Sequence, residues 1–154
     1  MSRSTLDIRW VTHRYANGVV NAWHSYAPVS SGGLFSLGAF DGAECVGVVI
    51  VNRPRARMLD DGRTAEVGRL ATNGREHAAS ALLGRARRVV QAMGFQRLVS
   101  YTLATEDGTC FKAAGWKPAA AVGGGKWSRD LPGRGGRRDA NVSAQEKIRW
   151  EVPL

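Results

Sequence analysis

The sequence predicts a single α+β domain, built on a mixed and mostly antiparallel sheet that is flanked by helices. Its 154 residues suit one domain, and a composition with 44% hydrophobic and 23% charged residues is typical of a globular protein. Strand-like segments come first, one long helical segment lies in the middle, and further strand-like segments follow it. This order is typical of an α+β domain.

The first fifty residues are predicted to form a short strand, a helix and a hairpin. Aromatic, apolar and polar residues mix over 8–26, which fits a short strand followed by a helix. A loop rich in Ser, Gly and Pro follows at 28–33. The strands predicted over 34–40 and 44–52 are joined by Asp41-Gly42, a pair that is typical of hairpin turns. The second of these strands has an unbroken apolar centre, so we expect it to be buried on both faces.

The middle of the chain is predicted to contain another strand and the longest helix. A polar connection over 53–63 leads to the strand at 64–72, which Asn73-Gly74 ends. The helix is predicted over 78–93, with Gly94 at the position of a left-handed C-cap residue. We expect four residues at helical spacing to form its buried stripe: Leu82, Ala86, Val89 and Met93.

The last third is predicted to add three strands and a second, shorter helix. The strands are expected over 96–103, 116–122 and 147–152, and the short helix over about 107–114. Between the last two strands lies a loop at about 123–140 that is rich in glycine and arginine. The sequence shows no internal repeat, so we expect residues 1–154 to form one domain that carries this loop.

The charge of the chain is strongly positive. It has 22 Lys and Arg residues against 13 Asp and Glu residues, which gives a formal net charge of +9 at pH 7. All the basic residues are arginines except Lys112, Lys117, Lys126 and Lys147. Such an excess favours anionic partners, such as nucleic acid or a phosphorylated cofactor. A GC-rich gene would also enrich arginine.

Several classes of protein are excluded by the composition. No apolar run reaches the ~20 residues that a membrane helix needs, and the first residues lack the apolar core of a signal peptide. We therefore expect a cytoplasmic protein. Two cysteines are too few for a disulfide scaffold or a four-cysteine zinc site. The three histidines are scattered along the chain, so no metal site is expected.

A strand, a loop and a helix in the middle of the chain carry a resemblance. The strand Glu66-Val67-Gly68-Arg69-Leu70-Ala71 runs into a loop at 72–79, a long helix starts near Ser80, and Gly115-Trp116 follows a further strand and a short helix. In these motifs and their order the chain resembles the Gcn5-related N-acetyltransferase (GNAT) superfamily. The resemblance implies the GNAT fold, acetyl-CoA or another acyl-CoA as the acyl donor, and an amine as the acceptor.

The same resemblance implies where the acyl-CoA binds. Backbone groups of Leu70, Ala71 and Thr72 would pair with the pantetheine arm, and the helix N-terminus would hold the pyrophosphate with its free N–H groups. The residues implied for the pyrophosphate are Arg75, His77, Ala78, Ala79 and Ser80. The superfamily pattern has Gln or Arg first, Gly fourth, and Gly or Ala sixth. It falls on 74–79, where the last position fits and a histidine replaces the central glycine.

Two further positions matter for catalysis by such an enzyme. Glu66 lies on the strand where many GNAT enzymes carry a catalytic base, so it is a candidate for that role. Alternatively, it is an outward-facing strand residue or a partner of Arg69 in a salt bridge. Many members place a tyrosine four residues before the final glycine, as the acid that protonates the leaving thiolate. Here that position is Phe111.

A narrower resemblance involves the segment after the first helix. Trp23-His24-Ser25-Tyr26, then a Pro, Ser-Gly-Gly and Gly47-Val48-Val49-Ile50 look like the Mom group of phage DNA-modification proteins, and Val99-Ser100-Tyr101 is also similar. This resemblance implies a phage-encoded enzyme that acts on the adenine amino group of DNA in the host cytoplasm. The shorter chain and the swapped order of Ser25 and Tyr26 differ from the group.

The Mom resemblance implies a set of residues for the acceptor. His24 and Tyr26 would be catalytic and Ser25 would position the amine, because a histidine can move a proton near neutral pH and a tyrosine can stack on a base. Ser100 and Tyr101 would line the acceptor cleft. Alternatively, Tyr26 makes a core contact of the helix and His24 faces solvent.

The arginine-rich loop is a candidate contact for nucleic acid. Lys126 and Arg129 would neutralise phosphates, and Trp127 would stack on a base that has been taken out of the duplex. Alternatively, the loop is a solvated surface segment. Three functions follow from the sequence: acyl transfer to a DNA base, acyl transfer to a small-molecule or protein amine, and non-catalytic binding of nucleic acid.

Overall fold

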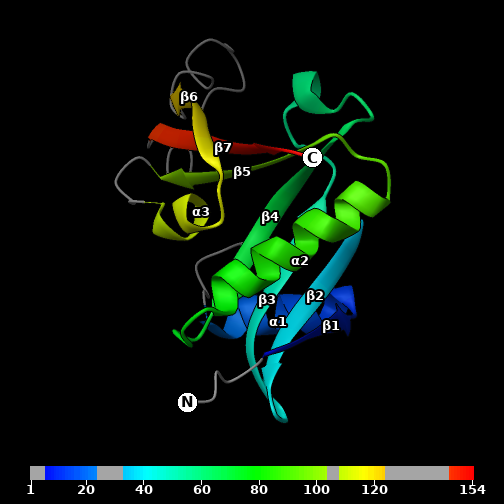
Figure 1. Ribbon diagram of the computed structural model, residues 1–154, viewed down its shortest axis with the longest axis vertical. Helices are drawn as coiled ribbons and strands as arrows, with labels where there is room; N and C mark the ends of the chain where they lie inside the picture. Colours follow the sequence, from blue (N-terminus) through cyan, green and yellow to red (C-terminus); the bar gives the residue numbers. More distant parts are fainter. Residues whose placement is uncertain (1–5, 24–32, 104–107, 124–145) are drawn as a thin grey trace, which may run out of the picture. The chain divides into compact units, whose positions relative to one another are not determined.

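The structure of the protein is a computed structural model that describes residues 6–23, 33–103, 108–123 and 146–154 (Figure 1). Within these ranges it contains the elements that the sequence predicts, in the predicted order. A short 3₁₀ helix, η1, is an addition in the polar connection. The elements are β1 (Asp7–Val11), α1 (His13–Trp23), β2 (Phe35–Asp41), β3 (Glu44–Asn52), η1 (Arg57–Leu59), β4 (Thr64–Thr72), α2 (Ala78–Ala92), β5 (Arg97–Leu103), α3 (Thr109–Ala113), β6 (Lys117–Gly123) and β7 (Glu146–Pro153).

The seven strands form one mixed sheet in the order β1-β2-β3-β4-β5-β7-β6. Strands β1 to β4 pair with one another in antiparallel fashion, β4 and β5 are parallel, and β6 and β7 are antiparallel. This confirms the predicted α+β fold with a mostly antiparallel sheet. The chain divides into two compact units, one made of residues 1–99 and 153–154 and the other of residues 100–152. No helix in the described part of the chain is long and apolar enough to cross a membrane.

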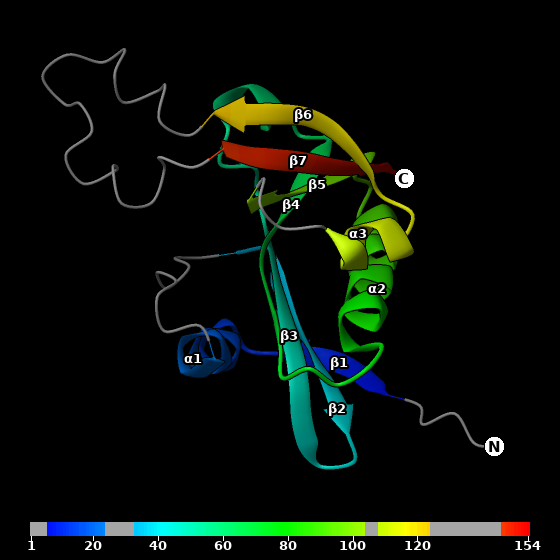
Figure 2. The same cartoon turned by 90° about the vertical axis from the view of Figure 1, so that its left-hand side faces the viewer.

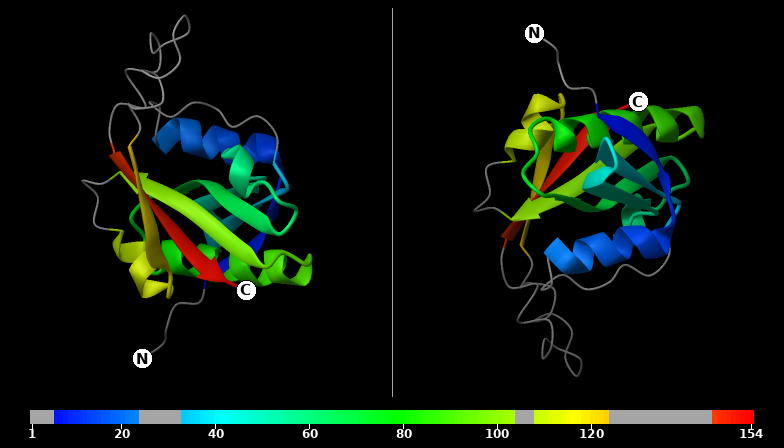
Figure 3. Two further views of the ribbon diagram at one scale, coloured as in Figure 1. Left: turned by 90° about the horizontal axis from the view of Figure 1, so that it is seen from above. Right: turned by 90° about the horizontal axis from the view of Figure 1, so that it is seen from below.

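In the first unit, helices cover both faces of the sheet. Figures 2 and 3 show α1 on one face of β2, β3 and β4 and α2 on the opposite face. This arrangement explains the unbroken apolar run of β3, in which every residue from Val46 to Val51 is buried. A strand between two helical layers has no solvent-facing side, so it cannot alternate polar and apolar residues.

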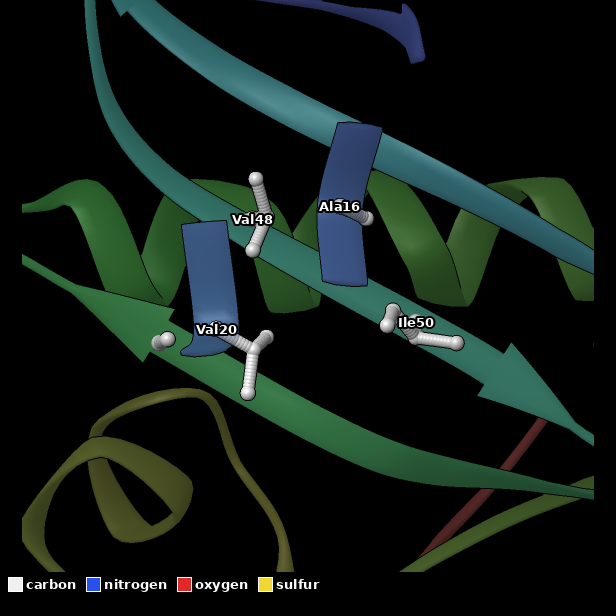
Figure 4. Close-up of a cluster of buried hydrophobic side chains, with 5 residues drawn as sticks. Ala16, Val20, Val48 and Ile50 are labelled. Carbon is white, nitrogen blue, oxygen red and sulfur yellow. The ribbon is translucent and has the colours of Figure 1, made fainter. Parts of the chain in front are cut away.

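The α1 face of the sheet has a small apolar core. Ala16 and Val20 of α1 lie over Val48 and Ile50 of β3 (Figure 4), and Ala71 of β4 completes the cluster. All five residues are at most 3% exposed. Because Ala16 carries only a methyl group, the helix backbone can approach the sheet closely at this point.

The buried stripe of α2 differs from the one that the sequence predicts. Leu82 and Ala86 are buried as expected, but Val90 takes the place predicted for Val89, and Met93 is 51% exposed. The helix ends at Ala92, so Met93 has no further turn to hold it against the sheet. The left-handed Gly94 follows, with φ 101°, as predicted for a C-cap.

The second unit has an aromatic core of its own. The Phe111 ring stacks on Trp150 with centroids 5.9 Å apart and meets the Trp116 ring edge-on at 5.0 Å. Trp150 donates a hydrogen bond from Nε1 to Thr102 Oγ1 at 2.9 Å. Gly108, with φ 64°, lies directly against the Trp150 ring, where a Cβ atom would collide with the indole. Three large rings therefore share a small volume around a glycine.

Candidate functional site

Strand β4 leaves the regular ladder partway along its length. On one side it pairs with β3, and the register jumps from Ile50↔Arg69 to Val51↔Val67, so that Gly68 is the extra residue of a bulge. On the other side, β4 pairs with β5 only over Thr64–Glu66. The rest of this outer edge has no strand partner among the described residues. It includes Leu70, Ala71 and Thr72, the positions predicted to pair with a pantetheine arm.

The loop after β4 is held in shape by its own side chains and backbone. Asn73 donates its N–H to Val46 O at 3.1 Å, and its Oδ1 accepts the N–H of Arg75 at 3.1 Å. Gly74 has φ 96°. His77 has φ 70° and is the one non-glycine residue with a positive φ in the described ranges. The resemblance to GNAT enzymes placed a glycine at position 77, and the observed backbone explains why, because a glycine has no penalty in this conformation.

The N-terminus of α2 presents unused backbone donors. The N–H groups of Ala78 and Ala81 bond to Arg75 O and His77 O, whereas those of Ala79 and Ser80 bond to nothing in the described part of the chain. Ser80 Oγ turns back and donates to His77 O at 3.2 Å. His77 precedes the helix without a side-chain cap. Open N–H groups and the positive end of the helix dipole suit an anionic group.

Arg75 is engaged within this structure. Its Nε donates to Asp41 Oδ2 at 3.0 Å, and its Nη1 donates to Glu76 O at 2.8 Å. Asp41 is the last residue of β2, directly before the turn to β3, so this ion pair links the hairpin to the loop before α2. The Arg75 side chain therefore orders the loop, while the backbone N–H groups of the helix stay open.

Glu66 is a buried carboxylate in the first unit. It is 5% exposed, and its Oε1 accepts the N–H of Arg55 at 3.0 Å. The alternative of an outward-facing strand residue is therefore wrong. Arg69 lies nearby and donates from Nη1 to Gly68 O at 2.7 Å. Burial lowers the pKa of Arg69, and the charge of Arg55 lowers it further, whereas the charge of Glu66 raises the pKa of Arg69. The charges of Arg55 and Glu66 therefore both bear on the Arg69 guanidinium, in opposite directions.

Asn52 completes this cluster. It lies opposite Glu66 in the register of β3 and β4, so both side chains lie on the same face of the sheet. Ile50, two residues earlier, belongs to the cluster under α1, which identifies this as the α1 face. The Asn52 carboxamide lies over Gly68, and its Oδ1 is buried without a hydrogen-bond partner among the described residues. Asn52, Arg55 and Gly68 are not among the site residues that the sequence predicts. The one available signal was a polar residue at the end of an apolar run.

The remaining predicted site residues fall into two groups. His24, Ser25 and Tyr26, and Lys126, Trp127 and Arg129, lie outside the described residues. Ser100 and Tyr101 lie on β5 in the second unit, where Ser100 is buried and Tyr101 is half-buried. Phe111 is 4% exposed within the aromatic core of that unit, so it serves as a packing residue there. The described residues contain no group of three or more His, Cys, Asp or Glu side chains that could hold a metal ion.

Comparison by sequence finds no relative: no protein-family model matches the chain, and no curated protein does. Comparison by structure finds several acetyltransferases. The IAA acetyltransferase from Bacillus cereus ATCC 14579 matches with a TM-score of 0.70 and 14% identity, over 97% of this chain and 100% of that one. The ribosomal-protein-S18-alanine N-acetyltransferase from Escherichia coli matches with a TM-score of 0.66 and 13% identity, over 97% and 94% of the two chains.

A third match was solved with a ligand. A GNAT family acetyltransferase from Elizabethkingia anophelis, with acetyl-CoA bound, matches with a TM-score of 0.64 and 12% identity, over 99% of this chain and 100% of that one. Likeness at such low identity is evidence about the fold. The narrower resemblance to the Mom group stays a prediction. The chain has the fold of the GNAT acetyltransferases.

Proposed function

We propose that this protein is an acyl-CoA-dependent N-acyltransferase, with acetyl-CoA as the acyl donor and an amine as the acceptor. The observation that carries the proposal is the pair of open N–H groups, of Ala79 and Ser80, at the start of the helix that follows β4. An anionic pyrophosphate fits such a helix N-terminus. Structures of the same fold support the choice of ligand, since one was solved with CoA and another with acetyl-CoA.

The residues present fit a CoA thioester in two further ways. The outer edge of β4 at Leu70–Thr72 can form backbone hydrogen bonds with the amide groups of a pantetheine arm, in the way that a sheet edge binds an additional strand. The left-handed backbone at His77 and Gly74 bends the loop so that it leads into α2. When bound, acetyl-CoA would supply an activated thioester carbonyl, which an amine nitrogen can attack.

Glu66 is the group that we assign to proton transfer. As a buried carboxylate, it would accept a proton from the acceptor nitrogen at one of its Oε atoms. The backbone N–H of Arg55 and the charge of Arg69 stabilise the ionised carboxylate in an environment where an unpaired carboxylate would be costly. Phe111 offers no hydroxyl to protonate a leaving thiolate, so we propose that this chain uses no acid at that position.

The finer prediction is that the acceptor is the adenine amino group of DNA. The net charge of +9 favours it, because a basic protein is attracted to a polyanion. Incubation of the protein with duplex DNA and acetyl-CoA, followed by mass analysis of the released nucleosides, tests it directly. A gain of one acyl mass on deoxyadenosine would support this acceptor, and unmodified DNA beside acylation of small primary amines would exclude it.

Calorimetry with acetyl-CoA tests the proposal as a whole. Ser80→Asp puts a carboxylate in the first turn of α2, where it suits the helix dipole but repels a pyrophosphate. We expect binding to weaken by roughly tenfold, or about 1.4 kcal/mol, in this variant. Gln91→Glu is the matched control, since it adds the same charge about 16 Å further along the helix, beyond the screening length in physiological salt.

The outcomes separate the proposed functions. Binding by the wild type and Gln91→Glu, with weaker binding by Ser80→Asp, supports the transferase. No binding at millimolar acetyl-CoA would remove the transferase proposal. Salt-sensitive binding of DNA in that case would favour the non-catalytic alternative, which Phe111 and the atypical loop also support.

A further inference from the structure

The outer edge of β1 has no strand partner in the described part of the chain. β1 is the first strand in the order of the sheet, and its other edge pairs with β2. It also carries Trp10, which is 66% exposed. An unpaired strand edge offers N–H and C=O groups to a further strand, and a large exposed ring beside it adds apolar contact area. This edge is therefore suited to binding an extended segment of a protein.

The two faces of β1 differ in their chemistry. The Arg9 guanidinium lies 4.0 Å from the centroid of the Phe40 ring, and Tyr15 of α1 packs on the same ring, so Arg9 lies on the α1 face. Asp7, two residues earlier, shares this face and forms an ion pair with Arg9 at 3.0 Å. The side chains of both residues are more than half exposed. The alternate positions, on the opposite face, are apolar: Leu6, Ile8 and Trp10.

A second copy of the chain has the charge pattern that complements this edge. Two identical strands that pair in antiparallel fashion about a two-fold axis must place one residue opposite itself, because an axis between two residues would join the apolar face of one strand to the charged face of the other. Pairing centred on Asp7 or Arg9 sets like charges opposite each other. Pairing centred on Trp10 leaves both charges without an opposite charge. Only pairing centred on Ile8 places the Asp7 of each copy opposite the Arg9 of the other.

We propose that two copies of this chain associate through the outer edges of their β1 strands, in antiparallel pairing centred on Ile8. Two ion pairs between Asp7 and Arg9 then cross the interface on one face of the joined sheet. Arg9 Nε binds Asp7 of its own chain, and the guanidinium has further N–H donors for the carboxylate of the second copy. On the opposite face, Trp10 of each copy lies beside Leu6 of the other. The inference does not depend on the proposed transferase function.

The centre of this edge already has one hydrogen bond. Arg85 of α2 donates from Nη1 to Ile8 O at 3.2 Å. This bond is at the long end of the usual range, and a carbonyl oxygen has a second lone pair, so Ile8 O can also accept the N–H of Ile8 from a second copy. Because β1 has only five residues, the interface is short, and we expect a dissociation constant on the order of 10–100 µM.

Sedimentation equilibrium of the full chain tests the pairing by charge reversal. The wild type should pass from monomer to dimer as its concentration rises from about 1 µM to about 1 mM. Asp7→Arg makes both charged positions of β1 positive, and Arg9→Asp makes both negative. Each variant alone therefore meets like charges at the interface, and its dimerisation should weaken by roughly tenfold or more. Arg14→Asp is the control, since it makes the same change of charge at an exposed position of α1 and should dimerise like the wild type.

The two reversals should rescue each other. In an equimolar mixture of Asp7→Arg and Arg9→Asp, positive positions of one chain face negative positions of the other, so dimers should form again. The double variant, which exchanges the two charges within one chain, should also dimerise. A wild type that stays monomeric at about 1 mM would overturn the inference and leave the edge of β1 to another partner. Single reversals that dimerise like the wild type, or a mixture that stays monomeric, would overturn it as well.

Discussion

Replacement of Asn52 by leucine should make the protein more stable. Asn52 Oδ1 is buried and accepts no hydrogen bond within the part of the chain that the structure describes, so we expect its desolvation to be uncompensated in the folded state. Leucine has a similar shape and no polar atom. The substitution therefore removes an unfavourable contribution and keeps the number and branching of the side-chain heavy atoms.

The expected size follows from the cost of an unsatisfied buried polar group, which is about 1–3 kcal/mol. Asn52 is only partly buried, and its carboxamide already packs on Gly68, so we expect a gain near the lower end, of about 1 kcal/mol. For a chain of this length, that corresponds to a rise of roughly 2–4 °C in the melting temperature.

Thermal and urea unfolding of Asn52→Leu, beside the wild type, measure this gain. Asn21→Leu is the control, because Asn21 is exposed on α1 and a leucine there buries little new surface. A loss of stability of 1 kcal/mol or more in Asn52→Leu, with an unchanged slope against urea, would refute the reasoning. It would mean that the amide makes a net favourable contribution to the folded state.

Three further predictions concern the glycine and loop positions. Gly108→Ala should destabilise the protein by about 2–4 kcal/mol, because the new Cβ meets the Trp150 ring at a left-handed position, whereas Gly115→Ala, with φ 88° and open space, should cost only about 1 kcal/mol in the same urea titration. Equal losses of stability in the two variants would show that contact with the Trp150 ring is not the cause. His77→Gly should change stability by less than about 1 kcal/mol, because relief of backbone strain offsets the greater entropy of the unfolded chain. The same variant should bind acetyl-CoA more tightly in calorimetry. Weaker binding would instead show that the imidazole helps to hold the ligand. The pKa of Asp61 is lowered by a backbone hydrogen bond, so its contribution to stability is present above its ordinary pKa and is lost as the pH falls through the lowered value. Asp61→Ala should therefore be less stable than the wild type near neutral pH and equal to it near pH 2, and a difference that persists in acid would contradict this.

The local elements could be predicted from the sequence because their signals are local. The turn residues Asp41-Gly42, the apolar run of β3 and the glycine after α2 each mark a boundary within a few residues of themselves. The buried stripe of α2 was predicted less well. Val90 replaces Val89 there because the sheet that the helix covers decides which side of the helix is buried.

The candidate site depends on contacts that no local pattern encodes. The pairing of Asn52 with Glu66 depends on a bulge at Gly68, and a shift of one residue in that register would move Asn52 to the other face of the sheet. The ion pair of Arg75 joins it to Asp41, which lies 34 positions earlier in the chain. A single sequence carries no record of such pairings, so Glu66 could be proposed from its strand while Asn52 could not.

The path of the chain between its two compact units has a consequence for synthesis on the ribosome. Leu154 donates its N–H to Gln96 O at 3.1 Å, and Arg87 donates to Pro153 O at 3.4 Å, so the last two residues belong to the first unit. Residues 100–152 are therefore inserted within that unit. The first unit cannot make these closing hydrogen bonds until the whole of the second has been translated. During translation the first unit therefore lacks its last two residues while some fifty further residues are synthesised, at about 5–20 residues per second.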